Sequence, residues 1–206
     1  MLTPARDEPV GLVLTAREGR TFHFDPGALC LELLPTGGSE RYPDFEVLSE
    51  PADLVRWAAG SRLAPGLEPA VDQRELAAAH ALRAALWPLA VDRAHGRAPS
   101  PADLDVVNAT AAEPPLAARI AADGTRTWGP GATGTQLLST VARDAVDLFT
   151  GPFAHRIREC EAHNCALVFV DTSRPGRRRW CSMERCGNRQ KAKAHRARHA
   201  ESEDTP

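Results

Sequence analysis

The sequence has few aromatic residues and lacks the long apolar runs of membrane proteins. Aromatic side chains make up 5% of its 206 residues, and its only two lysines are Lys191 and Lys193. No apolar run approaches the ~18–20 residues that a membrane-spanning helix needs, so no membrane partner is expected. The first eight residues show no basic region leading into an apolar stretch. We therefore expect no secretory signal and predict a cytoplasmic protein.

The usual short motifs of catalysis are also missing from residues 1–150. This part contains no glycine-rich phosphate loop, no nucleophile elbow and no paired-histidine motif. We therefore predict that the protein is not an enzyme. Hydrophobic residues make up 43% and charged residues 25% of the chain, which is ordinary for a globular protein with a real core.

Charge divides the chain into segments. Residues 1–155 contain 13 Arg and 20 Asp or Glu, whereas residues 156–199 contain 12 Lys or Arg and 4 Asp or Glu. Such a split indicates two modules, of which the basic one faces a polyanion. With Gly151-Pro152 as a plausible break, we predict domains at 1–150 and 151–200, followed by an acidic tail at 201–206.

The first domain is predicted to be predominantly helical with small β elements, in an α+β fold. Pro51 and Pro101 each begin the tetrapeptide Pro-Ala-Asp-Leu, in which proline suits the first helical turn and aspartate the positive helix end. Apolar periodicity predicts two further helices, at about 72–94 and 135–149. Pro88 should kink or end the first of these near Trp87.

Two β-hairpins are predicted in the same domain. One spans residues 10–24, where apolar residues alternate around a turn, and the other turns at Asp123-Gly124. Residues 30–34 fit either the start of a helix or a short buried strand.

Two single residues in this domain need separate interpretation. Arg83 lies within the apolar arc of its helix, and we favour a packed stem with the charged head in water over a buried guanidinium that holds a carboxylate or anion. Cys30 stands apart from the other cysteines, and we expect a small buried apolar side chain.

Four cysteines near the C-terminus form a candidate metal site. They are spaced as two C-x4-C pairs with 15 residues between them: Cys160, Cys165, Cys181 and Cys186. In a chain without a secretion signal this pattern favours a metal over disulfides. Four thiolates complete the tetrahedral shell of one structural Zn²⁺, and an iron–sulfur cluster is the less favoured alternative. Zinc would hold together a segment too short for a large core.

The motifs around these cysteines resemble the CGNR zinc finger family. Cys186-Gly187-Asn188-Arg189 is the tetrapeptide that names the family, and 169–173 and 178–183 also resemble it. The preceding domain resembles the ABATE domain, which usually precedes this finger and is described as a stress-induced transcription regulator. The resemblance implies zinc on the four cysteines and DNA binding. From the residues themselves we expect a treble-clef-like or knuckle fold that ends in a basic helix from about Met183 to Ala200.

Basic and amide residues of the finger are the candidate nucleic-acid contacts. Arginines could pair with phosphates or guanine, and amides could read base edges, although a solvated surface is the simpler explanation of any charge run. The candidates are Arg177, Arg178, Arg179, Arg185, Asn188, Arg189, Gln190, Lys191, Lys193, Arg196 and Arg198. DNA is the expected partner, with RNA, the ribosome or an acidic protein as the alternative. The N-terminal domain is expected to sense an unknown ligand or to form a homodimer.

Overall fold

The computed structural model describes residues 10–16, 19–37, 45–63 and 66–192. No helix within these ranges is both long and apolar enough to cross a membrane. The elements in chain order are β1 (Leu12–Thr15), β2 (Thr21–Phe24), α1 (Leu29–Leu33), the 3-10 turn η1 (Leu34–Thr36), α2 (Pro51–Gly60), α3 (Gln73–His95), α4 (Pro101–Ala112), β3 (Ala118–Ile120), β4 (Arg126–Trp128), α5 (Gly134–Thr150), the 3-10 turn η2 (Ala154–Arg156), β5 (Ile157–Glu159), β6 (Val168–Val170) and the π-helix η3 (Met183–Gly187).

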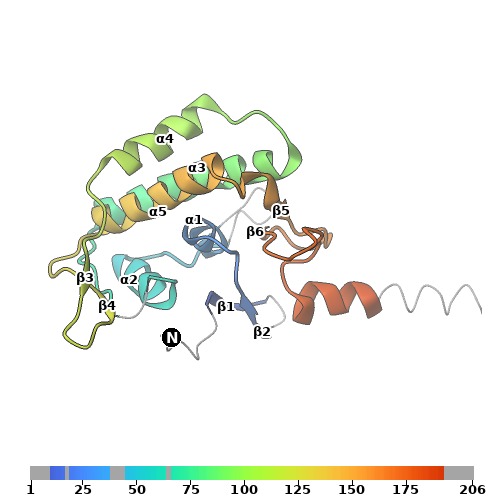
Figure 1. Cartoon of the computed structure of the whole chain (residues 1–206), viewed down its shortest axis with the longest axis horizontal. Coiled ribbons are helices and arrows are strands. Elements are labelled where there is room, and N and C mark those ends of the chain that lie inside the picture. Colours follow the sequence, from blue (N-terminus) through green and yellow to red (C-terminus); the bar gives the residue numbers. More distant parts are fainter. Residues whose placement is uncertain (1–9, 17–18, 38–44, 64–65, 193–206) are drawn as a thin grey trace, which may run out of the picture.

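Helices α3, α4 and α5 pack against one another, with α1 beneath them (Figure 1). The apolar faces of α3 and α5 bury Leu82, Leu86, Leu137 and Val141. All five residues of α1 are buried as well, so this short helix is surrounded by protein. The predicted α+β class, with a mostly helical N-terminal part, is confirmed.

Helix starts follow the capping chemistry of the sequence. Both Pro-Ala-Asp-Leu segments begin helices, α2 and α4, with proline in the first turn. The carboxylate of Asp72 accepts hydrogen bonds from the backbone N–H groups of Arg74 and Glu75, at 2.8 and 2.9 Å, and so caps α3. These bonds satisfy donors that the first helical turn leaves without partners.

Pro88 was expected to kink α3 or to end it near Trp87. The second alternative is wrong, because the helix continues to His95. Proline removes one backbone donor from a helix interior. Here the residues after Pro88 are held by the core, since Leu89 and Ala90 are buried. The helix ends instead at Gly96, whose φ of 69° is the left-handed conformation that suits a helix C-terminus.

Both predicted hairpins are present. β1 pairs antiparallel with β2, with Leu12 opposite Phe24, and β3 pairs with β4, with Ala118 opposite Trp128. Gly124, at φ 80°, makes the turn between β3 and β4. Residues 30–34, for which helix and strand were both open, are helical.

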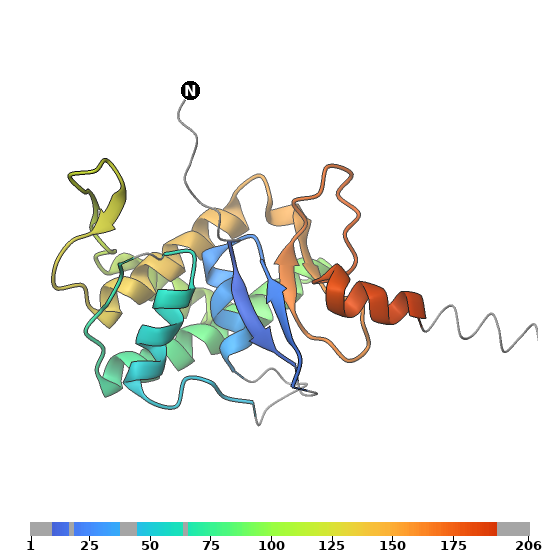
Figure 2. The ribbon, with the colours of Figure 1, turned by 90° about the horizontal axis from the view of Figure 1, so that it is seen from below.

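The cysteine-bearing segment is joined to the N-terminal part by a shared core. Strands β5 and β6 form an antiparallel pair, and their residues Ile157, Val168 and Val170 belong to the main core. The hairpin β1–β2 lies beside the finger (Figure 2), where Phe22 and Phe24 pack in one cluster with the four cysteines. The finger is therefore built onto the N-terminal part.

Candidate metal centre and basic surface

The four cysteines converge in space, as predicted. Cys160 follows β5, Cys165 closes the turn after it, and Cys186 lies within η3. All four side chains are buried, and their sulfur atoms lie within 4.8 Å of one another. The Sγ–Sγ distance is 3.7 Å between Cys165 and Cys181, and 3.6 Å between Cys181 and Cys186.

This geometry fits one tetrahedral zinc ion. A Zn–S bond is about 2.3 Å long, so two sulfurs of a tetrahedron are about 3.8 Å apart. Such a spacing leaves room for a single ion, whereas an iron–sulfur cluster holds several irons and sulfides between its thiolates. The four sulfurs thus form a zinc-finger site for one structural zinc. A metal requires the thiolate form of each cysteine, so binding would release the thiol protons.

Backbone hydrogen bonds shape the two knuckles that present the sulfurs. The N–H of Cys160 donates to the carbonyl of Leu167 at 2.9 Å, and the N–H of Cys165 donates to the carbonyl of Ala162 at 2.9 Å. In the second knuckle a Cβ at Gly187 would come within 2.6 Å of the Met183 sulfur. Met183 is 52% exposed and its side chain is flexible, so this contact alone does not require a glycine; the turn is held by the Gly187 N–H, which donates to the Ser182 carbonyl at 3.0 Å.

Asp171 organises the loop between the two knuckles, a role that sequence reasoning missed. Its side chain is fully buried and accepts hydrogen bonds from the N–H and hydroxyl of Ser173, at 2.9 and 2.6 Å, and from the N–H of Arg178, at 2.9 Å. The Phe-Val-Asp-Thr-Ser run was the available signal, because an aspartate followed by a serine two residues later commonly forms such a turn.

Two of the predicted nucleic-acid contacts face inward. The guanidinium of Arg178 donates to the carbonyls of Trp180 and Cys181 and lies 4.3 Å from the centre of the Phe169 ring. Arg185 lies over the Phe22 ring at 4.7 Å. Both side chains are half-buried and therefore pack within the protein, whether or not they also contact a nucleic acid.

Other candidates lie on the surface of the finger. Arg177, Arg179, Asn188 and Lys191 are exposed. The head of Arg179 lies between the Glu161 carboxylate, at 2.6 Å, and the Trp180 ring, at 5.0 Å. Trp180 itself packs against the cysteine cluster, which is the packing role expected for a tryptophan beside a metal ligand.

The start of the predicted basic helix is present. Residues 188–192 continue η3 as an α-helix and carry the half-buried Arg189 and Gln190. Lys193, Arg196, Arg198 and the acidic tail lie outside the described residues, as does the predicted end of this helix. The assignment of these side chains to nucleic acid stays a prediction.

The favoured interpretation of Arg83 is wrong, and the alternative is correct. Its side chain is buried, and Nη1 donates to Thr36 Oγ1 at 3.0 Å and to Glu46 Oε1 at 2.9 Å. The guanidinium therefore holds a carboxylate instead of reaching water. The expectation for Cys30 is confirmed, because this side chain is fully buried in the main core, and burial raises the pKa of its thiol.

Comparison with known families gives two matches that together span most of the chain. The ABATE model, described as "Putative stress-induced transcription regulator", matches residues 27–152. The CGNR zinc finger model matches residues 156–199. The chain belongs to the ABATE family. Its CGNR finger contains all four cysteines of the metal centre, and the hairpin β1–β2 precedes the matched part of the ABATE domain. A comparison with curated proteins finds no match.

Proposed function

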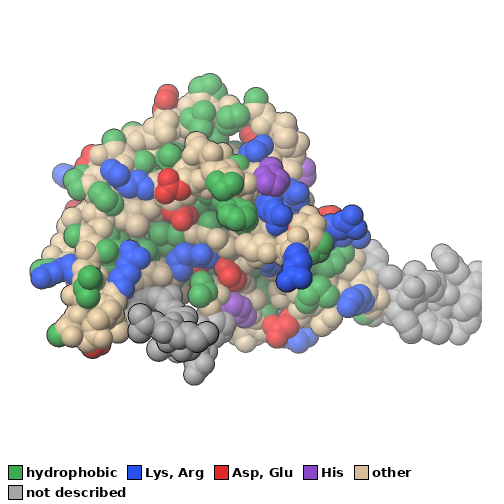
Figure 3. Space-filling view, viewed as in Figure 1, with side chains coloured by type: hydrophobic (Ala, Val, Ile, Leu, Met, Phe, Trp, Pro, Cys, Tyr) green, Lys and Arg blue, Asp and Glu red, His purple; other side chains and the backbone are tan. Residues whose placement is uncertain are grey.

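We propose that this ABATE-family protein is a transcription regulator that binds duplex DNA through its zinc-stabilised CGNR finger. The observation that carries the proposal is the basic surface beside the metal centre. Residues 156–199 contain 12 Lys or Arg against 4 Asp or Glu. Blue side chains are visible on the finger in Figure 3. Phosphate neutralisation by such side chains supplies most of the non-specific affinity of proteins for DNA.

The exposed basic residues lie where they could contact a nucleic-acid backbone. Arg177 and Arg179 border a hollow of about 340 Å³ that Trp180, Ser182 and Met183 also line. This hollow lies directly before the helix that carries Asn188, which is exposed and offers an amide for a base edge. Phosphates would position the finger, and a few side chains of this helix would contact bases.

Two further expectations belong to the proposal. A single finger offers few base-reading side chains, so useful specificity calls for two copies on one site. The chain would act by binding rather than by catalysis, and the N-terminal part would respond to a signal.

The test is fluorescence anisotropy of the zinc-loaded full chain with three probes: a duplex from upstream of its own gene, a random duplex and a structured RNA. Each phosphate contact on B-DNA contributes roughly 0.9 to the slope of log affinity against log salt concentration. We expect tighter binding to the upstream duplex and a steep slope. The Arg177→Gln/Arg179→Gln double variant should lower the slope by about 2 if both side chains contact phosphates.

The matched control is Arg119→Gln/Arg126→Gln, which removes two arginines from the hairpin β3–β4 of the acidic domain. It should leave the salt slope unchanged. Preference for the RNA would favour the alternative of an RNA- or ribosome-binding module. No salt-sensitive affinity for any of the three probes would contradict the proposal and direct attention to acidic protein partners.

A further inference from the structure

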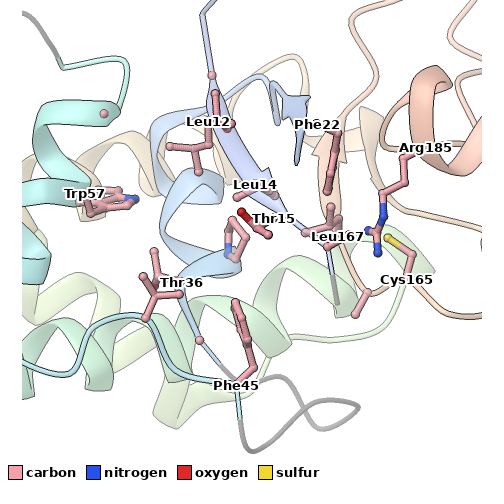
Figure 4. Close-up of a pocket in the computed structure, with 18 of the residues that line it drawn as sticks. Leu12, Leu14, Thr15, Phe22, Thr36, Phe45, Trp57, Cys165, Leu167 and Arg185 are labelled. Atoms are coloured by element: carbon pink, nitrogen blue, oxygen red, sulfur yellow. The ribbon is translucent and has the colours of Figure 1, made fainter. Parts of the chain in front are cut away.

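A cavity of about 890 Å³ lies on the seam between the hairpin β1–β2, α2 and the first knuckle of the finger. In Figure 4 its walls reach from Trp57 on α2 to Leu167 and Arg185 of the finger, with Phe45 on a third side. Cavities of 300–1,000 Å³ are typical of sites for small organic ligands. The volume therefore suits one drug-sized molecule.

The lining is mostly apolar and includes side chains that remain in contact with water. Leu12, Leu14, Phe22 and Trp57 form much of the wall. Phe45 is 44% exposed and Val47 47% exposed, although both border the cavity. Exposed apolar groups gathered around a hollow are typical of a binding site, because a ligand would remove them from water.

Arg185 places one cationic group at this apolar surface. Its Nε is buried and has no hydrogen-bond partner, one of two such side-chain atoms in the described part of the chain. Within the same ranges the guanidinium forms no ion pair, and its contact is the Phe22 ring. A buried polar atom without a partner calls for an explanation, and a missing ligand is one.

The other charged residues of the lining already have partners. Asp53 accepts hydrogen bonds from the N–H groups of Ser49 and Glu50 at the start of α2, and it pairs with Arg56. Among the described residues that line the cavity, Arg185 is therefore the cation that does not pair with a carboxylate. The zinc thiolates beside it carry a net negative charge, which would repel a dianion more strongly than a group with one delocalised charge.

We propose that this cavity binds a small amphipathic monoanion, with an aromatic or aliphatic body and one carboxylate or sulfonate group. The body would cover Leu14, Phe45 and Trp57, and the anionic group would accept hydrogen bonds from Arg185. The ligand would therefore touch the finger and the N-terminal part at once. This site is independent of whether the finger binds DNA.

The test uses two fluorescent probes with similar apolar bodies, the anionic 1-anilinonaphthalene-8-sulfonate and the uncharged N-phenyl-1-naphthylamine. We expect the zinc-loaded full chain to bind each probe with 1:1 stoichiometry. Arg185→Gln should weaken the anionic probe about tenfold or more, as expected for the loss of a charge-assisted hydrogen bond, and leave the uncharged probe unchanged. Arg189→Gln removes a charge from the same helix outside the cavity lining and should affect neither probe.

A second variant fills the cavity without touching Arg185 or the cysteines. Gly60 lines the cavity, and a Cβ there would meet no atom within 4 Å, so Gly60→Phe can attach a ring at the cavity wall without a clash at its Cβ. It should weaken both probes, whereas the control Ala59→Phe, on the exposed neighbouring residue, should weaken neither. Zinc content and near-ultraviolet circular dichroism confirm folding of each variant. Failure of 1:1 binding, or equal binding by wild type, Gly60→Phe and Arg185→Gln, would overturn the proposal.

Discussion

Arg83 on α3 and Glu46 form an ion pair in which the guanidinium is buried. Gly37 lies directly against this pair, since a Cβ there would come within 2.1 Å of Arg83 Cζ. The pair therefore attaches Glu46 to the helical core. Gly37 and Glu46 also form an isolated antiparallel bridge.

Removal of the Glu46 charge should destabilise the protein. Glu46→Gln leaves Arg83 buried without its carboxylate, so we expect a loss of about 1–3 kcal/mol in the free energy of unfolding. Urea denaturation followed by circular dichroism measures this loss. Glu50→Gln is the control, because its 3.5 Å pair with Arg56 is exposed and such pairs contribute little. Equal stability of the two variants would contradict the role assigned to Glu46.

The contribution of Glu46 should also depend on pH. Burial by itself would raise the pKa of Glu46, but hydrogen bonds from Arg83 and from the N–H of Leu48 outweigh it and lower that pKa. A lowered pKa in the folded state gives stability that is present above the unfolded value, about 4.3, and lost as the pH falls through the folded value. The difference in unfolding free energy between wild type and Glu46→Gln should therefore be present at neutral pH and shrink below about pH 4. If this difference instead grew as the pH fell, the pKa of Glu46 would be raised in the folded state, which would contradict the prediction.

Loss of one metal ligand should abolish zinc binding and unfold the finger. Cys181→Ser removes the sulfur that lies 3.7 and 3.6 Å from those of Cys165 and Cys186. Metal binding supplies much of the folding free energy of small zinc domains, so the purified variant should contain no zinc. Metal analysis measures this directly. Cys30→Ala is the matched control, and it should retain one zinc ion because Cys30 lies in the main core, away from the cluster.

Phe24 should support the metal centre from outside the finger. Its ring is 1% exposed and packs in the cluster of the four cysteines. Phe24→Ala should cost about 3–5 kcal/mol, the usual range for a buried phenylalanine, and should speed transfer of zinc to a chelating dye. Phe153→Ala removes a ring that is 53% exposed and should change neither quantity. Lower stability with unchanged zinc transfer would show that the hairpin β1–β2 does not protect the finger.

Local sequence determined the helices, the hairpins and the metal ligands. Caps such as Asp72 and turns such as Asp123-Gly124 act through hydrogen bonds between residues close in the chain, so their patterns are sufficient to predict them. Cysteine spacing alone predicted the four ligands, because two close pairs of cysteines in a chain without disulfides are typical of a metal site. The continuation of α3 past Pro88 was not predictable in this way, since packing of Leu89 and Ala90 decides it.

The tertiary structure alone decided which charged side chains face inward. Arg83 and Arg185 meet a carboxylate and a ring from distant segments, those of Glu46 and Phe22, and Arg178 folds back over Phe169 of the same finger. The cavity on the seam likewise needs β1, α2 and the finger together. Burial and electrostatic pairing depend on contacts between residues far apart in the chain, and local patterns do not contain that information.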